Sequence, residues 1–262
     1  MDRTTRNALL AALLACSLSG TTAVHAAEVG GSLAYSYGFK PEFHESDGPG
    51  NYHLVAGSAA LKDGATAYRL GLSAIATNTP EREVSINDPS LSVGRSLPLG
   101  EGGLVLSGGV SASYGASLRS RDAGYRGSVG ASVSLGQQFG ELSAGIGTGV
   151  TRHLNRYTLS ASGSPSAVYS ASVSLSLGYA LTNDLSAYVS LVYAKTHRYA
   201  GADVYSYANA FGVNYAVDTQ LSFNAGLRTT DAQLSPNGSD NNELTLYKRN
   251  QTEGSVGFTY AL

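Results

Sequence analysis

The chain of 262 residues has little of several features that are common in soluble proteins. It contains one cysteine, one methionine and no tryptophan, and only 14% of its residues are charged, which is low for a soluble domain. No stretch beyond the N-terminal region approaches the ~20 consecutive apolar residues that a membrane-spanning helix needs. Glycine and tyrosine, by contrast, are abundant, with 32 and 17 residues. Because charged residues are scarce, the arrangement of the apolar and small residues is the main indication of the fold.

The N-terminal region has the organisation of a secretory signal peptide. Arg3 and Arg6 precede an apolar run from Ala8 to Leu18, and valine and alanine occupy positions −3 and −1 of a cleavage site that follows the run. The apolar run is too short to cross a membrane as a helix. We therefore expect a signal peptide at residues 1–26 and an exported mature part at residues 27–262.

Cys16 permits a second interpretation of the same region. The sequence Leu13-Leu14-Ala15-Cys16 loosely resembles a lipoprotein box in which Cys16 is acylated, whereas in the first interpretation Cys16 only fills the signal sequence. If residues 1–26 are removed, the mature part has no cysteine, so its stability rests on hydrogen bonding and packing instead of disulfides. Removal also takes two of the 17 basic and one of the 19 acidic residues. The near-neutral remainder gives no basis for nucleic-acid binding.

The mature part alternates with a period of two residues. In the segment 169–181, Tyr, Ala, Val and Leu at odd positions alternate with Ser, Gly and Ala at even positions, and segments 104–115 and 128–135 have the same arrangement. Strict alternation over such lengths predicts β-strands with one apolar face and one face of small, mostly polar residues.

The connections between these segments are alternately short and long. Turn residues predict tight connections at 62–64, 100–102, 139–141, 182–184 and 218–220, and long ones at 40–51, 78–83, 119–124, 152–165, 197–203 and 230–253. An up-and-down barrel with short periplasmic turns and longer outer loops requires this alternation. We therefore predict a single antiparallel transmembrane barrel of about twelve strands with both termini on the periplasmic side.

A soluble β-sandwich is the alternative fold, because its strands also alternate. Its solvent-facing side usually carries Lys, Glu, Thr and Arg, whereas the non-apolar face here is mostly Ser, Gly and Ala. Small residues suit a crowded lumen, so the pattern favours the barrel.

The last eight residues form a strand in which Val256, Phe258, Tyr260 and Leu262 share one face. With the export signal and the alternating hairpins, this closing strand resembles that of bacterial outer-membrane β-barrel proteins, and the resemblance covers nearly all of the mature part. It implies a location in the cell outer membrane, contact with membrane lipid and lipopolysaccharide, and transient recognition by the barrel-assembly machinery. Gly257, Tyr260 and Leu262 are the candidate assembly signal; the family most often ends in phenylalanine, from which Leu262 departs.

Tyrosines recur where strand ends and membrane interfaces are expected, and their rings can lie in lipid while the hydroxyls reach headgroups. Ordinary strand propensity is the simpler explanation of their abundance. The candidates for this aromatic girdle are Tyr35, Tyr37, Tyr114, Tyr125, Tyr169, Tyr179, Tyr193, Tyr207, Tyr215 and Tyr260.

Basic residues on the small-residue face are the candidates for selectivity. About twelve strands enclose more space than small side chains fill, and no segment is a good plug candidate, so we expect a water-filled passage. By their parity the following residues share its lining: Arg69, Arg119, Arg126, His153 and Arg228. Arginines in a narrow lumen favour anionic solutes, and the chain is similar in this general sense to twelve-stranded porins for acidic sugars. Alternatively, Arg119 and Arg126 lie at the outer rim and bind lipopolysaccharide phosphates or loop carboxylates.

Asn87-Asp88-Pro89 interrupts the alternation, and a proline inside a strand requires a bulge. Asp88 then either enters the lumen as a constriction or ligand contact, or belongs to a bulge near the outer rim that only shapes the barrel.

The resulting prediction is a porin-like channel for passive diffusion of small hydrophilic solutes, with anionic solutes as one candidate class. The alternative is a non-conducting structural or adhesive barrel whose surface loops bind partners. We do not expect an enzyme: His44-Glu45-Ser46 matches the His-x-Ser order of barrel lipid hydrolases, but flanking Pro and Gly place it in a loop. The histidines have no metal-ligand spacing, so neither a metal nor another cofactor is expected.

Overall fold

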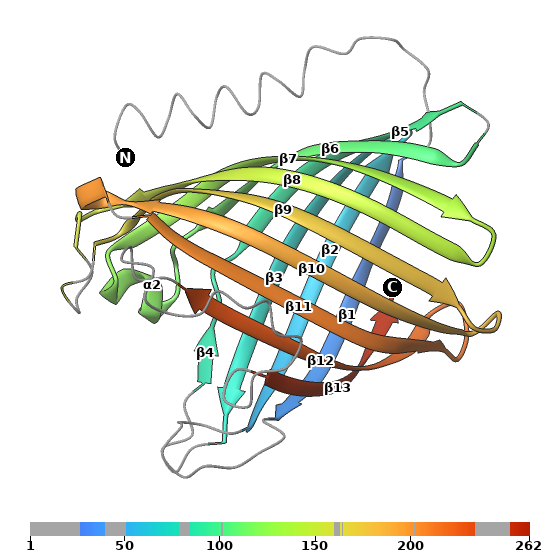
Figure 1. Cartoon of the computed structure of the whole chain (residues 1–262). Helices are drawn as coiled ribbons and strands as arrows, with labels where there is room; N and C mark the ends of the chain where they lie inside the picture. The colour runs from blue at the N-terminus through green and yellow to red at the C-terminus, as the bar shows by residue number, and fades with distance from the viewer. Residues whose placement is uncertain are drawn as a thin grey trace.

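The structure, a computed structural model, describes residues 27–39, 51–78, 84–100, 102–159, 163, 165–201, 203–233 and 252–262. The described residues form one closed antiparallel β-barrel of 12 strands (Figure 1). Its strands are β1 (Glu28–Phe39), β2 (Asn51–Asp63), β3 (Thr66–Thr77), β4 (Val84–Ile86), β5 (Ser90–Leu99), β6 (Leu104–Tyr114), β7 (Tyr125–Phe139), β8 (Leu142–Asn155), β9 (Ala167–Ala180), β10 (Leu185–Arg198), β11 (Asp203–Ala216), β12 (Leu221–Gln233) and β13 (Thr252–Ala261). The short segments β4 and β5 both pair with β3 and together make one interrupted strand.

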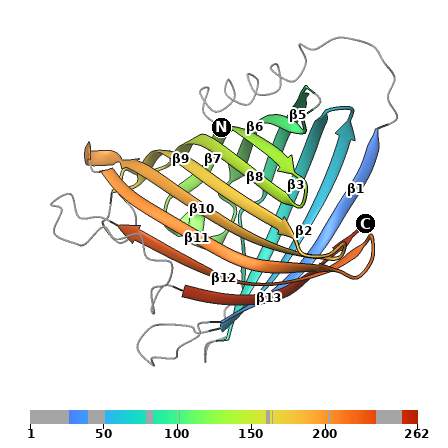
Figure 2. The ribbon, with the colours of Figure 1, turned by 45° about the vertical axis from the view of Figure 1, so that its right-hand side comes forward.

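The first and last strands close the barrel (Figure 2). They pair antiparallel from Ser32 opposite Ala261 to Phe39 opposite Gly254, and the Leu262 N–H donates to the Gly31 carbonyl at 2.9 Å. Because β1 and β13 run antiparallel at this seam, the start of β1 and the end of β13 lie at the same end of the barrel. The location of that end on the periplasmic side stays a prediction. The predicted fold, including the number of strands, is confirmed.

The apolar faces of the strands point outward. Along β9, Val173, Leu175 and Leu177 are about half exposed (48–52%), while most of the serines between them are less accessible. No large apolar side chain is buried anywhere in the described part of the chain. A soluble sandwich would have a buried apolar core, so the structure excludes that alternative. Within the same described ranges, no helix is long and apolar enough to cross a membrane.

Tyrosine rings on the inner face lie flat against the wall where neighbouring strands carry glycine. The ring of Tyr188 on β10 lies over Gly212 of β11 and Gly226 of β12, and that of Tyr52 on β2 lies over Gly38 of β1. A Cβ on Gly212 would come within 2.5 Å of the Ala225 carbonyl oxygen and 2.9 Å of the Tyr188 ring. These glycines therefore let large side chains pack along the wall and not across the passage.

The short connections lie where the sequence predicts them. In the turn between β11 and β12, the Asp218 carboxylate accepts backbone hydrogen bonds from Gln220 and Leu221, each at 2.7 Å. The hydrogen bond from Leu221 and then that from Gln220 favour the ionised carboxylate and hold the pKa of Asp218 below its usual value. Gly64 and Gly140 adopt positive φ angles of 56° and 59° in two other turns, a conformation that glycine reaches without strain.

The long connections differ from the prediction in two ways. The expected loop 119–124 contains a short helix, α2 (Leu118–Asp122), which lies at the end of the barrel away from the C-terminus (Figure 1). The strands also extend into the expected loops: β8 continues to Asn155, and β10 continues to Arg198 before a 3-10 turn at Tyr199–Gly201. A segment without clear alternation of apolar and polar residues can still extend a strand, because its backbone hydrogen-bonds to the neighbouring strand.

One member of the expected tyrosine girdle faces the lumen. Tyr125 donates or accepts a 3.0 Å hydrogen bond with the Ser113 hydroxyl, and Ser113 belongs to the inner face. A register shift between Tyr125 and Gly127 turns the side chain inward, so parity counted from the middle of β7 gives the wrong face. The girdle members with the most exposed side chains, at 49–68%, are Tyr114, Tyr169, Tyr179, Tyr193 and Tyr215.

The close approach of Tyr188 to Gly212 gives a stability prediction. Gly212→Ala should lower the free energy of unfolding by about 1–3 kcal/mol, because the new methyl group forces Tyr188 and the β12 backbone apart. Gly136→Ala is the matched control on the inner face, since its Cβ would meet nothing closer than the Ala144 carbonyl oxygen at 3.8 Å. Urea unfolding of both refolded variants measures the difference between their midpoints. The folded fraction at each urea concentration is read from the change in gel mobility that heating causes. Equal midpoints for the two variants would contradict this packing.

Candidate functional site

The lumen is the candidate site, and one half of its wall is lined almost entirely by serine and glycine. On β5–β10 the inner-face hydroxyls bond across neighbouring strands: Ser96 to Ser107 at 2.8 Å, and Ser113 to Ser128 at 2.9 Å. A cavity of about 400 Å³ lies against this wall, and its lining includes Ser107, Ser134, Ser143, Ser174 and Ser176. The alternation that predicts the strands thus produces an uncharged, hydroxyl-rich surface.

His153, a predicted lumen residue, is on this inner wall. Its Nε2 lies 3.0 Å from the Ser170 hydroxyl, which in turn lies 2.9 Å from the Thr196 hydroxyl. The imidazole also lies beside the inward-facing Tyr125, with the ring centroids 6.2 Å apart. His153 therefore belongs to a hydrogen-bonded chain across β8, β9 and β10 and does not stand alone in the passage.

The charged side chains of the lumen belong to the other half of the wall. Arg69 on β3 is exposed on the inner face, with Ala60 and Ser92 as its neighbours in register. Arg228 on β12 lies directly opposite Glu253 on β13, and the Tyr52 hydroxyl reaches Glu253 across β1 at 3.4 Å. The sequence prediction included the two arginines but missed Glu253.

The charges on this wall nearly cancel. Apart from residues at register breaks, the described inner-face basic residues are Lys62, Arg69 and Arg228, and the acidic residues are Glu28 and Glu253. Asp88 adds a further acidic side chain from the break between β4 and β5. Lys62 and Glu28 form an exposed ion pair of 3.4 Å near the end where the termini lie. Arg69 is therefore the basic residue of this set whose register neighbours are all uncharged.

The remaining two predicted arginines lie near the outer rim. Arg126 is the extra residue at the register shift in β7, so its parity does not decide its face, and its carbonyl accepts a 2.9 Å hydrogen bond from the Gly115 N–H. Arg119 lies in α2, and its side chain falls outside the described part of the structure. No contact among the described residues joins Arg126 to Arg69 or Arg228.

Asp88 lies in the break between β4 and β5, which confirms the predicted bulge. It lines a cavity of about 260 Å³ together with the inner-face residues Ser58, Ser73 and Ser90. Its carboxylate accepts hydrogen bonds from the Ser117 N–H at 2.8 Å and from the Ser120 hydroxyl. Asp88 thus faces the lumen and also fastens the segment that contains α2. Its role as a constriction or ligand contact stays a prediction.

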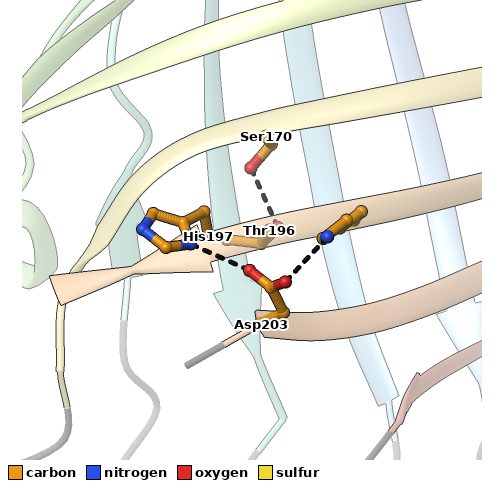
Figure 3. A network of polar contacts seen from close by, with 5 residues as sticks. Ser170, Thr196, His197 and Asp203 are labelled. Atoms are coloured by element: carbon orange, nitrogen blue, oxygen red, sulfur yellow. Dashed lines mark hydrogen bonds and ion pairs between the residues drawn. The ribbon is translucent and has the colours of Figure 1, made fainter. Parts of the chain in front are cut away.

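The sequence prediction missed a polar cluster on the outer face of β10 and β11. Asp203 pairs with Lys195 at 2.7 Å and with His197 at 2.8 Å, while the consecutive residue Thr196 points inward to Ser170 (Figure 3). The His197 ring stacks on Tyr169 with centroids 4.9 Å apart. The alternation places Lys195 and His197 on one face, but only the hairpin register shows that Asp203 lies beside them.

The candidate assembly residues lie along the seam. Gly257 pairs with Ser36 of β1, and Tyr260 pairs with Leu33 and donates its hydroxyl to Gln220 at 3.1 Å. Leu262 is 74% exposed. The signal peptide, Cys16 and His44-Glu45-Ser46 lie outside the described residues. Within the described ranges, no three His, Cys, Asp or Glu residues are grouped as a metal site would need.

Comparison with known proteins shows the fold but no close relative. A search of protein-family models finds no match to this chain. A search of curated protein sequences finds no match either.

Among solved structures, the barrel is similar to the COG4313 outer-membrane channel from Pseudomonas putida F1, with a TM-score of 0.61 and 10% identity over 92% of this chain and 97% of the other. It is also similar to the NanC porin (TM-score 0.57, 15% identity, 87% and 98% covered) and to the KdgM porin bound to disordered oligogalacturonate (0.52, 10%, 87% and 98%). Together with its apolar outer face, these likenesses show that the chain has the fold of the porins and channels of the bacterial outer membrane.

Proposed function

We propose that this protein is a porin-like channel through which small hydrophilic solutes diffuse passively across the outer membrane. The observation that carries the proposal is the lining of the closed barrel: hydroxyls and glycines face inward on β5–β10, and the inward tyrosines Tyr52 and Tyr188 lie flat against glycines. Side chains packed along the wall leave room for water and solute, whereas side chains packed across it would fill the interior.

Passage needs no chemical step. Serine hydroxyls both donate and accept hydrogen bonds, so they replace part of a solute's hydration shell as it moves along the wall. Because many of these hydroxyls already bond to one another, as Ser113 does to Ser128 at 2.9 Å, their extra contacts with a solute are weak. Weak contacts at many points allow a solute to leave as readily as it enters.

Ionic selectivity in this proposal is slight and depends on Arg69. Two of the three basic residues of the charged wall have an acidic partner in register: Glu28 lies opposite Lys62 and Glu253 lies opposite Arg228. Arg69 keeps an uncompensated positive field next to its neutral neighbours Ala60 and Ser92. This arrangement supports a mild preference for anions and not a strongly anion-selective pore.

The proposal extends to the protein's surroundings. The barrel-assembly machinery would read Gly257, Tyr260 and Leu262 before the seam closes, since the outward Tyr260 and the exposed Leu262 are accessible at the end of β13. Lipopolysaccharide would surround the end of the barrel that carries Lys195 and His197.

Planar-bilayer recording on the refolded protein tests the proposed passage. Stable steps of ion current should appear on insertion, since the lumen is lined by hydroxyl groups and charged side chains that water solvates. A heat-unfolded sample of the same preparation is the control. A folded, inserted barrel that carries no current would overturn the channel and favour a structural or adhesive barrel.

Three variants test the source of selectivity. Arg69→Ala should lower the anion-to-cation permeability ratio by about twofold, because it removes an uncompensated charge from a confined lumen. Glu253→Gln should raise the ratio, and the double variant Arg228→Ala/Glu253→Gln should stay near the parent, because it removes one charge of each sign. Reversal potentials in a salt gradient measure all three. An Arg69→Ala channel with an unchanged reversal potential would remove Arg69 from the selectivity mechanism.

A further inference from the structure

The barrel wall has one place, among the described residues, where a strand edge has no partner strand. The segment β4 pairs with β3, as Ile86 does with Ala74, and with no other described strand. The β5–β6 ladder ends with Ser90 opposite Ser113, and the β6–β7 ladder ends with Tyr114 opposite Gly127. One more backbone hydrogen bond follows each ladder, from the Tyr114 N–H to the Pro89 carbonyl at 3.1 Å and from the Gly115 N–H to the Arg126 carbonyl at 2.9 Å. Beyond these bonds no described strand lies between β4 and β7, and we call this interruption the notch.

The short helix α2 packs at this notch. It contacts both β4 and β7. The Ser117 hydroxyl caps the helix by accepting a 3.1 Å hydrogen bond from the Ser120 N–H. The helix satisfies part of its own backbone beside the open strand edge, because the Arg121 N–H donates to the Ser117 carbonyl at 3.0 Å.

Few polar contacts hold α2 to the β4–β5 side. The Asp88 carboxylate accepts hydrogen bonds from the Ser117 N–H at 2.8 Å and from the Ser120 hydroxyl, and just before the segment the Pro89 carbonyl accepts from the Tyr114 N–H at 3.1 Å. The helix-containing segment is bracketed by Gly115 and by Gly124, whose φ is +69°. Both ends of the segment are fixed on the side of β7 and β8, because the Gly115 N–H donates to the Arg126 carbonyl at 2.9 Å and the Gly124 carbonyl accepts from the Arg156 N–H at 2.6 Å. Asp88 holds the segment on the opposite side of the notch.

The two sides of the notch differ in polarity. On the outer face, Val84 and Ile86 of β4 and Tyr114 of β6 are 73%, 60% and 68% exposed. On the inner face lies the cavity of about 260 Å³ that Asp88 and Ser90 line. The notch thus joins an apolar, lipid-facing surface to a polar lumen over the thickness of one wall.

We propose that this notch is a lateral portal through which a small amphiphile, with an apolar tail and an uncharged polar head, passes between the lumen and the bilayer when α2 swings away. The tail of such a molecule contacts Val84, Ile86 and Tyr114, while its head remains with the serines of the inner cavity. The portal is a second route, separate from passage along the barrel axis, and it does not depend on the proposed function.

The test uses accessibility of engineered cysteines in the full chain, in a Cys16→Ser background. Ala56→Cys places a thiol on the inner wall of the Asp88 cavity, and Ser174→Cys places one on the inner wall of β9. In proteoliposomes, a dodecyl maleimide dissolved in the bilayer should label the Ala56→Cys thiol about tenfold faster when Asp88→Asn is added, since losing hydrogen bonds to a charged group releases α2.

Two controls make the result decisive. The dodecyl maleimide should not label Ser174→Cys faster in the Asp88→Asn background, and a sulfonated, water-soluble maleimide should label both thiols at unchanged rates. Ser120→Ala, which keeps the carboxylate, should act in the same direction and replaces Asp88→Asn if that variant does not fold. Equal labelling of Ala56→Cys with and without Asp88→Asn, or a parallel increase at Ser174→Cys, would overturn the portal. Loss of labelling by the sulfonated reagent alone would instead count against the aqueous channel.

Discussion

The structure depends on one constraint: in a bilayer, every backbone N–H and C=O must find a partner within the protein. The pairing of β1 with β13 meets this constraint by turning a sheet into a barrel, and it also brings the start of β1 and the end of β13 to one side. All other features follow from closure. The apolar face then turns outward because lipid surrounds the barrel, and the small face lines the space that the strands enclose.

Two of the register irregularities of the described strands change which side chains reach the lumen. At the break between β4 and β5, Pro89 cannot donate to the ladder, so the wall loses continuity and α2 covers the edge that remains. At the start of β7, the register shift lets Tyr125 reach the Ser113 hydroxyl on the inner face. Both irregularities are close to the rim, where the ladder has fewer neighbours to enforce its register.

Much of the fold could be predicted because period-two patterning and turn chemistry are local properties. The alternation of 169–181 marks β9 and its two faces, and Asp218 marks a turn through its own backbone hydrogen bonds. The site was harder to predict because it depends on which strands are neighbours. Arg228 is visible in the sequence as a lumen candidate, but Glu253 lies 25 positions later and meets it only through the register of β12 with β13. The pairing of His197 with Asp203 was missed for the same reason.

The location of charge in the lumen links the fold to its expected behaviour. An isolated arginine in a confined, low-dielectric passage attracts anions, whereas an arginine opposite a glutamate creates a local dipole whose field decays over a short distance. The inner wall holds both arrangements, Arg69 among neutral neighbours and Arg228 opposite Glu253. Counting basic residues by parity therefore overestimates selectivity. A passing solute experiences the summed field of the charges on neighbouring strands. The opposite wall of hydrogen-bonded serines adds polarity without net charge.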